Sequence, residues 1–420
     1  MVGQVHPMWR IFVVFGAGYL LSSALRGVTA TLAPSFVQTF HLQPAQLGIL
    51  GGMYFLGFAL MQLPAGAWLD RFGSRPVLSV SLLLAALGSY LFATAESFAG
   101  LVVARFACGV GVSACLIAPL TSARLWLSPP RQQQVNSWML MVGALGLLIA
   151  TLPAQMVANL WGWRVVFLVT AAGFVLTVTA ILAWVPGGAP SVCGSEPWFR
   201  SYAPILKSRH TWKMAPLGFF SYAILVAVQT LWAGPWLTDV SGVSVDGAAM
   251  GLFGINVVML LVFLGLGFVV PRVVRSEAGA QGALRVGLPF SVGALLMIPI
   301  VGADAGWVHF SVYCVASAVL ALTHPAVGQL FPVQLAGRAI AFFNLVLFLG
   351  VFVAQWGVGA IVEAVLEVDG SVLVAYQTAF IVLGLLSLLS YLWFLGFDRF
   401  FTLGAVKTAG RIPVKAKRSV

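Results

Sequence analysis

The chain contains twelve apolar runs, each long enough to cross a lipid bilayer as a helix. A helix needs about 20 mostly apolar residues to span about 30 Å of hydrocarbon. Because a helix also satisfies its own backbone hydrogen bonds, such runs predict an all-α integral membrane protein with twelve transmembrane helices. The predicted spans lie near 11–32, 46–68, 77–95, 99–121, 137–160, 164–185, 214–238, 248–270, 284–303, 308–330, 339–362 and 372–397.

The composition excludes several other classes. Only 8% of the 420 residues are charged and 60% are hydrophobic, whereas about a quarter of a soluble chain is charged. The net charge of +11 therefore does not indicate nucleic acid, since little water-exposed sequence is left to carry a basic face. The cysteines form no CxxC pair and accompany no cluster of histidines, so no metal site, disulfide framework or cofactor is predicted; they are Cys108, Cys115, Cys193 and Cys314.

The distribution of charge predicts the orientation. Nineteen of the 22 Lys and Arg residues lie in the N-terminal segment, in alternate loops and in the C-terminal tail, and seven of the 11 Asp and Glu residues lie in the opposite loops. Because basic loops stay in the cytoplasm, both termini are predicted to be cytoplasmic, in the cell (inner) membrane. The basic tail is suited to the anionic headgroups of the lipid bilayer.

One long polar stretch divides the chain. It predicts an N-terminal six-helix bundle over 1–185, a cytoplasmic central loop over 186–213, and a C-terminal six-helix bundle with a short basic tail over 214–420. A similar G-x-x-x-[DP]-R segment ends the second span of each half, at 66–71 and at 267–272, followed by Arg75 and Arg275. We therefore expect two pseudo-symmetric bundles that arose by duplication.

Three motifs carry a family resemblance. The run Gly66-Ala67-Trp68-Leu69-Asp70-Arg71-Phe72-Gly73-Ser74-Arg75 resembles the cytoplasmic loop signature of the major facilitator superfamily, G-x-L-x-D-R-x-G-R-K/R, although Trp68 replaces Leu and Ser74 replaces a basic residue. Residues 105–111 resemble the family's R-x-x-x-G-x-G pattern, and Gly162-Trp163-Arg164 is a common family element. The resemblance implies a monomeric secondary transporter in which two bundles rock about a central site.

The loop signature is interpreted as a gating motif. The Asp70 carboxylate can accept hydrogen bonds from a neighbouring helix N-terminus or from an arginine. Gly66 and Gly73 are expected to allow close helix approach and a tight turn. The arginines of the motif, which also fix the topology, are Arg71, Arg75 and, in the second half, Arg272.

Two arginines, Arg26 and Arg105, lie within predicted spans that contain no carboxylate. Burying such a charge costs about 2.5–3.5 kcal/mol, so each guanidinium needs a partner. Both lie at a depth of roughly 10 Å, and the resemblance implies that their helices line a central cavity. The partners are either helix carbonyls and amides, or an anionic substrate. An anion is the favoured interpretation for Arg26, whereas both interpretations stay open for Arg105.

Other polar residues in the spans complete the predicted site. The substrate-binding candidates besides the arginines lie in spans that the resemblance implies line the cavity, with interhelical packing as the alternative role; they are Tyr54, Gln62, Gln229, Asn256, Asn344 and Gln355. Gln229 and Asn344 lie near the middle of their spans. His324 is the candidate for proton coupling, with simple packing as its alternative. A proton or sodium is the expected coupling ion.

These observations predict a secondary active transporter that moves a small organic or inorganic anion, with import favoured, by alternating access. An efflux antiporter for amphipathic drugs or metabolites is the alternative. An integral-membrane enzyme is less consistent, because no HExxH, Walker or nucleophile-elbow motif is present and no catalytic residues are predicted. A transporter-like sensor would need a larger soluble domain than the tail provides.

Overall fold

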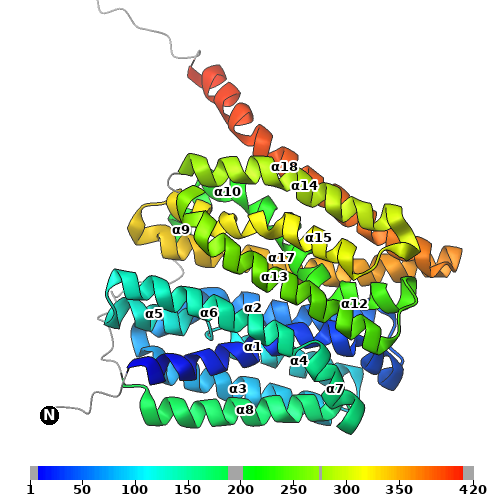
Figure 1. Cartoon of the computed structure of the whole chain (residues 1–420). Coiled ribbons are helices and arrows are strands. Elements are labelled where there is room, and N and C mark those ends of the chain that lie inside the picture. Colours follow the sequence, from blue (N-terminus) through cyan, green and yellow to red (C-terminus); the bar gives the residue numbers. More distant parts are fainter. Residues whose placement is uncertain (1–7, 188–201, 274–276, 410–420) are drawn as a thin grey trace, which may run out of the picture.

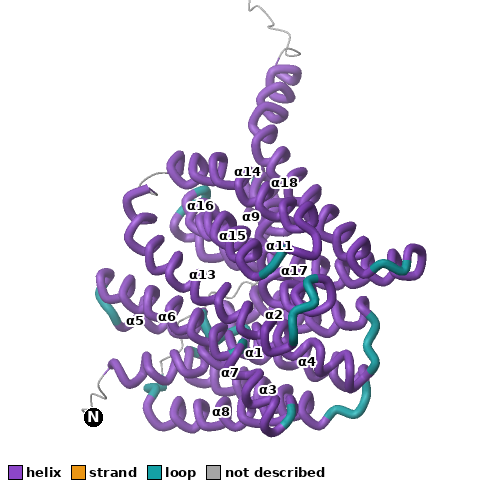
Figure 2. The backbone as a smooth tube through the Cα atoms, turned by 45° about the vertical axis from the view of Figure 1, so that its right-hand side comes forward, coloured by secondary structure: helices purple, strands orange, loops and turns teal. Residues whose placement is uncertain are grey.

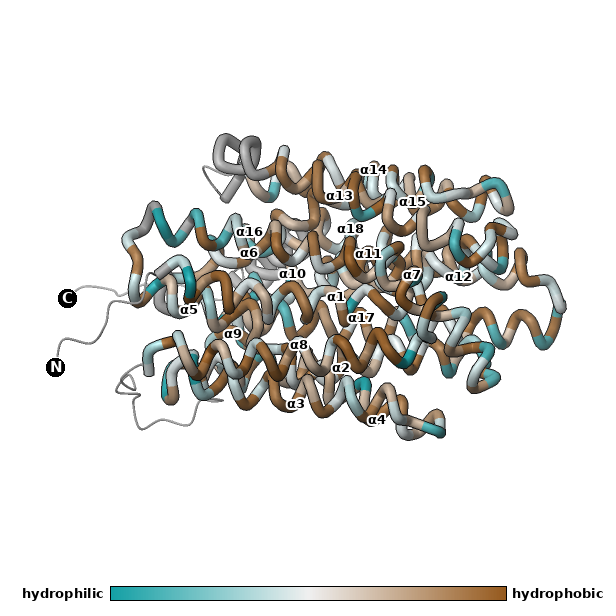
Figure 3. Tube along the Cα trace, turned by 60° about the horizontal axis from the view of Figure 1, so that its bottom comes forward, coloured by the Kyte–Doolittle hydropathy of each residue, from teal (hydrophilic) through white to brown (hydrophobic). Residues whose placement is uncertain are grey.

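A computed structural model describes residues 8–187, 202–273 and 277–409. These residues are almost entirely helical, and twelve helices among them are long and apolar enough to cross a membrane. The predicted number of spans and the all-α fold class are therefore confirmed. Figure 3 shows apolar residues along the middle of the helices and hydrophilic residues gathered toward their ends.

The first half contains eight helical segments that form six spans, because the fourth and fifth spans are each interrupted once. The break in the fourth span is a turn over 113–116, and that in the fifth is at 150–151. The helices are α1 (Met8–Phe40), α2 (Pro44–Phe72), α3 (Ser74–Thr94), α4 (Phe98–Val112), α5 (Ile117–Trp126), α6 (Pro129–Ile149), α7 (Leu152–Trp161) and α8 (Trp163–Trp184).

The second half repeats this arrangement, and its fourth span is again interrupted, here by the short 3₁₀ segment η6. Segments η2, η3 and η4 are π-helical and η5 is 3₁₀-helical. The elements are α9 (Ala203–Lys207), α10 (Arg209–Pro216), η2 (Leu217–Tyr222), α11 (Ala223–Ala227), η3 (Val228–Trp232), α12 (Ala233–Pro235), η4 (Trp236–Val240), α13 (Val245–Val273), α14 (Glu277–Val301), η5 (Gly302–Asp304), α15 (Trp307–Ser317), η6 (Ala318–Leu322), α16 (Thr323–Gln329), α17 (Val333–Asp369) and α18 (Val372–Ala409).

The two halves lie side by side as two bundles. In Figure 1 the helices of the first half, blue to teal, occupy the lower part of the molecule, and those of the second half, green to red, occupy the upper part. Figure 2 shows that short loops join antiparallel neighbours. We call the end that carries Arg71, Arg124 and Arg338 the basic end, and the end that carries Asp246 and Glu363 the acidic end.

Local sequence signals fix the helix ends. Ser97 caps α4 by accepting a hydrogen bond of 3.2 Å from the Gly100 backbone N–H. Gln43 and Gln46 form a reciprocal capping box at the start of α2. Gly73 ends α2 with a φ of 80°, which favours glycine. The first helix runs to Phe40, beyond its predicted end near residue 32, because Pro34 is accommodated inside the helix.

Matching aromatic clusters hold each bundle together near the acidic end. In the first half, Phe36 of α1 packs edge-on against Trp163 of α8, with ring centroids 5.2 Å apart. In the second half, Trp236 of η4 packs against Phe380 of α18 at 4.8 Å. Both clusters join the first and last helices of a half, so the pseudo-symmetry includes the packing. Trp163 belongs to the Gly162-Trp163-Arg164 element, and Arg164 covers its ring at 4.5 Å.

Candidate functional site

Arg105 of α4 is enclosed within the first bundle. It is 1% exposed, and its Nη1 donates a hydrogen bond of 3.1 Å to the Leu25 carbonyl oxygen while its Nη2 donates one to Thr29 Oγ1. The guanidinium carbon lies 5.2 Å from the ring centroid of Tyr54 and 5.7 Å from that of Phe92. Arg105 is therefore partnered by a helix carbonyl, a hydroxyl and two aromatic rings.

Arg26 of α1 is in a different environment. It is partly exposed. Its buried Nε has no hydrogen-bond partner in the structure, as is also true of the Arg105 Nε, but no described residue accepts a hydrogen bond from the rest of the Arg26 guanidinium. No described residue forms an ion pair with it. Its charge acts on the hydroxyl of Tyr54 in the first half and on that of Tyr222 in the second half. Because these tyrosines belong to opposite halves, Arg26 lies at the junction of the two bundles, and none of the described residues compensates its charge.

The second half contributes an aromatic and polar group to the same junction. The Tyr222 ring lies edge-on to the His324 ring at 5.6 Å, and His324 Nε2 shares a hydrogen bond of 2.8 Å with Asn344 Oδ1. Three helical elements, η2, α16 and α17, meet here. We call Arg26, Tyr54, Tyr222, His324 and Asn344 the junction cluster.

The Gln229 and Asn256 amides, although predicted as site residues, bond to each other. Gln229 Nε2 donates a hydrogen bond of 3.2 Å to Asn256 Oδ1, and Asn256 Nδ2 donates one of 2.9 Å to the Leu252 carbonyl oxygen. Together they link η3 to α13. The structure describes no contact between this pair and Arg26.

Gln355 and Gln62 are the two most enclosed of the predicted amides. Gln355 is 0% exposed, and its Nε2 donates a hydrogen bond of 3.0 Å to Thr230 Oγ1 while its carbonyl oxygen accepts one of 3.1 Å from Trp232 Nε1. Gln62 Nε2 bonds to the carbonyl oxygen of Phe58, one turn earlier in α2, at 3.4 Å. In this conformation Gln355 joins α17 to η3, and Gln62 bonds within its own helix.

The seventh span, which contributes Tyr222 to the junction cluster, has an irregular backbone. Three of its segments, η2, η3 and η4, are π-helical; η2 carries Tyr222, and η3 carries Gln229 and Trp232. π-Helical turns are rare and frequently accompany functional sites, because they widen the helix and redirect its side chains. The hydrophobic pattern of the span gives no sign of them, since an i→i+5 turn leaves the composition unchanged.

At the acidic end, two side-chain hydrogen bonds connect the bundles. Glu363 Oε2 of α17 accepts a hydrogen bond of 3.0 Å from the Ala45 backbone N–H at the start of α2. Asn159 Nδ2 of α7 donates one of 2.9 Å to Asp246 Oδ1 of α13. From the sequence, both carboxylates had contributed only to the predicted orientation of the chain.

Glycines bring the two backbones close at the same end. Pro34 has no N–H, which leaves the Ala30 carbonyl oxygen without its intrahelical partner, and a Cβ at Gly234 of α12 would collide with that oxygen. A Cβ at Gly48 would likewise collide with the Gln355 carbonyl oxygen. Small residues at such positions let membrane helices pack closely. The acidic end is therefore closed in this structure.

At the basic end, the gating motif makes contacts within its own half. Gly73 forms the predicted tight turn, with its N–H donating to the Leu69 carbonyl oxygen at 2.9 Å. Arg75 Nη2 donates a hydrogen bond of 2.5 Å to the Leu182 carbonyl oxygen at the end of α8. Arg71 is exposed and lies over the Phe72 ring at 5.2 Å. The Arg272 side chain is outside the described residues.

The expected close approach at Gly66 is wrong for this conformation, because a Cβ there would meet no atom within 4 Å. Asp70 is exposed and forms no hydrogen bond or ion pair with another described residue. The positive charges that act on its carboxylate are those of Arg338 in the second half and Arg124 in the first. Burial raises the pKa of the neighbouring Tyr202, and Asp70 adds to that rise while Arg338 opposes it.

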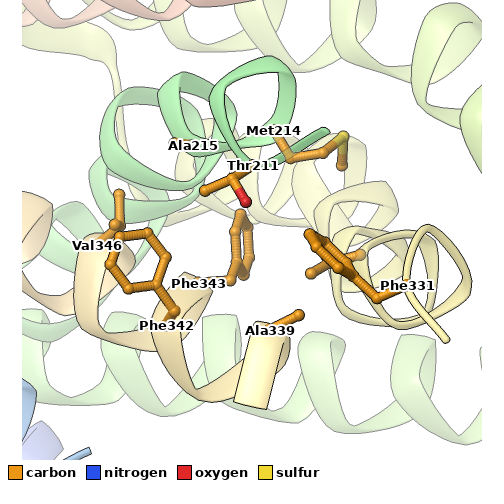
Figure 4. Close-up of a pocket in the computed structure, with 9 residues that line it drawn as sticks. Thr211, Met214, Ala215, Phe331, Ala339, Phe342, Phe343 and Val346 are labelled. Atoms are coloured by element: carbon orange, nitrogen blue, oxygen red, sulfur yellow. The ribbon is translucent and has the colours of Figure 1, made fainter. Parts of the chain in front are cut away.

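A small apolar pocket lies between α10, α16 and α17 near the basic end, with the Phe342 and Phe343 rings on one wall (Figure 4). Its volume is about 10 Å³, which accommodates about one water molecule. The pocket is thus a packing defect too small for a metabolite, and the junction cluster remains the candidate site.

Sequence reasoning identified some of this arrangement and missed other parts. It singled out Arg26, Arg105 and Tyr54, which the structure brings together, and His324 and Asn344, which bond to each other. It missed Thr29 as a partner of Arg105. It also missed the cross-bundle roles of Glu363 and Asp246. No local pattern distinguishes these residues, because their partners are 76, 318 and 87 positions away.

Comparisons with known proteins agree with this architecture. The niacin transporter NiaP of Acinetobacter baylyi is 26% identical over 168 residues, which are 40% of this chain and 38% of that protein. The galacturonate transporter of Dickeya chrysanthemi is 27% identical over 177 residues (42% and 50%). The multidrug resistance protein MdtL of a Shewanella species is 36% identical over 104 residues (25% and 26%). The chain thus spans half or less of the length of these relatives.

The fold and the family follow from two further matches. A bacterial homolog of the human lysosomal transporter Spinster, solved in an inward-facing and occupied conformation, aligns with a TM-score of 0.73 and 16% identity over 94% of this chain and 98% of that one. Residues 15–355 match the family model of the Major Facilitator Superfamily. The sequence motifs, the paired six-helix bundles and this match together place the chain in the major facilitator superfamily.

Proposed function

We propose that this protein is a secondary active transporter that moves a small organic anion by alternating access. The observation that carries the proposal is the uncompensated charge of Arg26 at the junction of the bundles. A cation within a membrane span and without a carboxylate needs a partner, and a guanidinium pairs with carboxylate or phosphate through two parallel hydrogen bonds. A substrate anion supplies that partner when it binds.

The names of two relatives support a carboxylate in particular. Niacin and galacturonate are both carboxylic acids, and both relatives are transporters. In the proposed site, the Arg26 guanidinium binds the carboxylate, and the Tyr222 ring forms the adjoining wall. Tyr54 is 1% exposed, so it contacts a substrate only if the bundles rearrange. Asn344 and the Gln229–Asn256 pair are the proposed polar contacts for the rest of the substrate.

Arg105, Gln62 and Gln355 have a supporting role in this proposal. Arg105 fixes α1 through Leu25 and Thr29, and so holds the helix that presents Arg26. Gln355 joins α17 to η3 behind the site. All three side chains are 2% exposed or less in this conformation, so contact with a substrate requires the bundles to rearrange.

The two ends act as the proposed gates. The excess of Lys and Arg supports a proposed orientation with the basic end in the cytoplasm, in which closure of the acidic end corresponds to an inward-facing state. In the opposite state, the Asp70 carboxylate engages Arg338 across the halves and the acidic-end contacts separate. His324 is the proposed site of proton coupling, because it is the titratable member of the junction cluster in the physiological range.

Uptake into proteoliposomes tests the proposal. The assay compares radiolabelled niacin and galacturonate with neutral sugars for the native chain, Arg26→Ala, Arg26→Lys and the control Arg131→Ala, an exposed arginine outside the junction. We expect loss of carboxylate uptake with Arg26→Ala. Arg26→Lys should weaken it, because lysine keeps the charge but not the planar fork. Normal uptake by both Arg26 variants would refute the anion site.

Efflux of amphipathic drugs is the second candidate function, and the similarity to MdtL favours it. Cationic drugs generally need an embedded carboxylate, and the predicted spans contain none. Drug accumulation in cells that express the chain separates the two functions. Reduced accumulation of cationic dyes, together with no carboxylate uptake, would support efflux instead.

A further inference from the structure

A groove of about 430 Å³ lies at the basic end, between α10 and α18. Its lining residues are Lys207, Arg209, Trp212, Trp393 and Phe397. Arg209 begins the seventh span and Phe397 ends the twelfth, and the two helices lie next to each other in the upper part of Figure 1. The groove is therefore located where two spans leave the apolar layer.

The aromatic floor of the groove is held in place by its own hydrogen bonds. Trp393 Nε1 donates a hydrogen bond of 2.9 Å to the Trp212 carbonyl oxygen, and Trp212 Nε1 donates one of 2.9 Å to the Leu206 carbonyl oxygen. Trp212 is nevertheless 52% exposed and Trp393 48% exposed. Because the polar N–H groups are already paired, the surface that the indoles offer is apolar.

The rim of the groove is cationic. Lys207 and Arg209 are both exposed, and neither forms a hydrogen bond or ion pair with any residue in the part of the chain that the structure describes. Lys213, one turn along α10, is not part of the rim, because it is buried and its Nζ donates a hydrogen bond of 3.0 Å to Gln281 Oε1. The groove thus presents paired positive charges above an apolar floor, at the height where lipid headgroups meet acyl chains.

We propose that this groove binds an anionic phospholipid from the leaflet at the basic end. The phosphate of the headgroup pairs with Lys207 and Arg209, and an acyl chain lies against Trp212, Trp393 and Phe397. The volume falls within the roughly 300–1,000 Å³ of small-molecule sites. Aromatic residues favour the membrane interface, and basic residues there attract anionic headgroups. A soluble peptide would match the charge but would not match a floor that opens into the bilayer.

Lipid retention on the purified full-length chain tests this site. Native mass spectrometry compares dioleoylphosphatidylglycerol with zwitterionic dioleoylphosphatidylcholine for the native chain and for the double variant Lys207→Gln, Arg209→Gln. Each interfacial cation raises the affinity for an anionic lipid about fivefold. We therefore expect the affinity of the double variant for phosphatidylglycerol to fall about 25-fold. The matched control is Arg10→Gln, Arg131→Gln, which removes two exposed cations elsewhere at the basic end and should keep the native affinity.

Two further measurements complete the test. Phosphatidylglycerol retention by the native chain, which needs no variant, should fall as ionic strength rises from about 0.1 M to about 1 M, because the Debye length falls from about 10 Å to about 3 Å. Trp393→Leu should weaken retention of both lipids. Three results would each overturn the proposal. The native chain could retain the two lipids equally, the two double variants could lose affinity equally, or inorganic phosphate could displace the lipid completely.

Discussion

Glu363 and Ala45 are 318 positions apart in the sequence, yet the Glu363 carboxylate accepts a hydrogen bond of 3.0 Å from the Ala45 backbone N–H. Ala45 is in the first turn of α2, where the amide groups have no intrahelical partner and the helix dipole favours a negative charge. A carboxylate of one bundle therefore caps a helix of the other, and the cap exists only while the acidic end is closed.

Glu363→Ala is expected to favour opening of the acidic end. A charge at a helix N-terminus contributes about 1 kcal/mol, which corresponds to about a fivefold change in the equilibrium between the two states. Electron paramagnetic resonance distances between spin labels at residues 96 and 368, on opposite bundles, should show a larger population of long distances. Glu367→Ala, one turn later and exposed, is the control. The same shift in both variants would contradict the specific cap.

Gly234→Ala is expected to block closure of the acidic end. Its new Cβ would collide with the Ala30 carbonyl oxygen, and overpacking of this kind costs about 1–3 kcal/mol. Transport should fall at least several-fold while membrane insertion is retained. The matched control is Gly357→Ala, since a Cβ there meets nothing within 4 Å. Transport by Gly234→Ala at the native rate would show that the bundles need not approach so closely.

Arg105→Gln is expected to lower stability more than it alters substrate selection. The change removes the donor to the Leu25 carbonyl oxygen and the contact with Thr29, and each buried polar group left unpaired costs about 1–3 kcal/mol. The melting temperature in detergent should fall, and the same measurement on Arg26→Lys should give the native value. A native melting temperature for Arg105→Gln, with a raised KM, would assign Arg105 to the substrate instead.

Asp70→Asn is expected to impair the return to the state that is closed at the basic end. The amide keeps the shape of the side chain but loses the charge attraction to Arg338 and Arg124. Insertion and yield should remain native, whereas the maximal transport rate should fall. Spin-label distances across the basic end provide the measurement, with Arg131→Gln as a control for surface charge. Unchanged transport kinetics would refute the latch.

His324→Gln is expected to uncouple transport from the proton gradient. Glutamine can still bond to Asn344 but cannot gain or lose a proton in the physiological range. Uptake driven by a pH gradient should be lost, whereas exchange of labelled for unlabelled substrate should continue. If His324→Gln takes up substrate at the native level under a pH gradient, His324 is not the proton-coupling residue. Sodium or substrate exchange would then be the remaining candidates for coupling.

The sequence predicted the features that depend on local composition. Twelve apolar runs gave the spans, and the Gly66–Arg75 run pointed to the family, because bilayer thickness and loop motifs act over short stretches of chain. Two arginines without an acid among the spans indicated the charge imbalance at Arg26. Even Tyr54, chosen only as a polar residue in a span, lies beside both arginines.

The sequence did not reveal the features that depend on how the bundles meet. Arg105 of α4 is compensated because Leu25 and Thr29 of α1 bond to it, and this contact between helices leaves Arg26 as the arginine without a partner. The π-helical turns around Tyr222 and Gln229 depend on packing, since their residues suit an ordinary α-helix equally well. The cross-bundle bonds of Glu363 and Asp246 join segments whose proximity exists only in the folded state.

The closed acidic end combines backbone groups, the Ala45 N–H and the carbonyl oxygens of Ala30 and Gln355, with the side chains of Glu363, Asn159 and Asp246. The side chains proposed to select the cargo, Arg26 and Tyr222, take no part in those contacts. In the proposed mechanism, recognition and mechanical motion are thus encoded at separate positions. Under such an arrangement, mutations that change the cargo can accumulate over evolutionary time while the gate keeps working. Selectivity can then also be engineered without changing the contacts that close the acidic end.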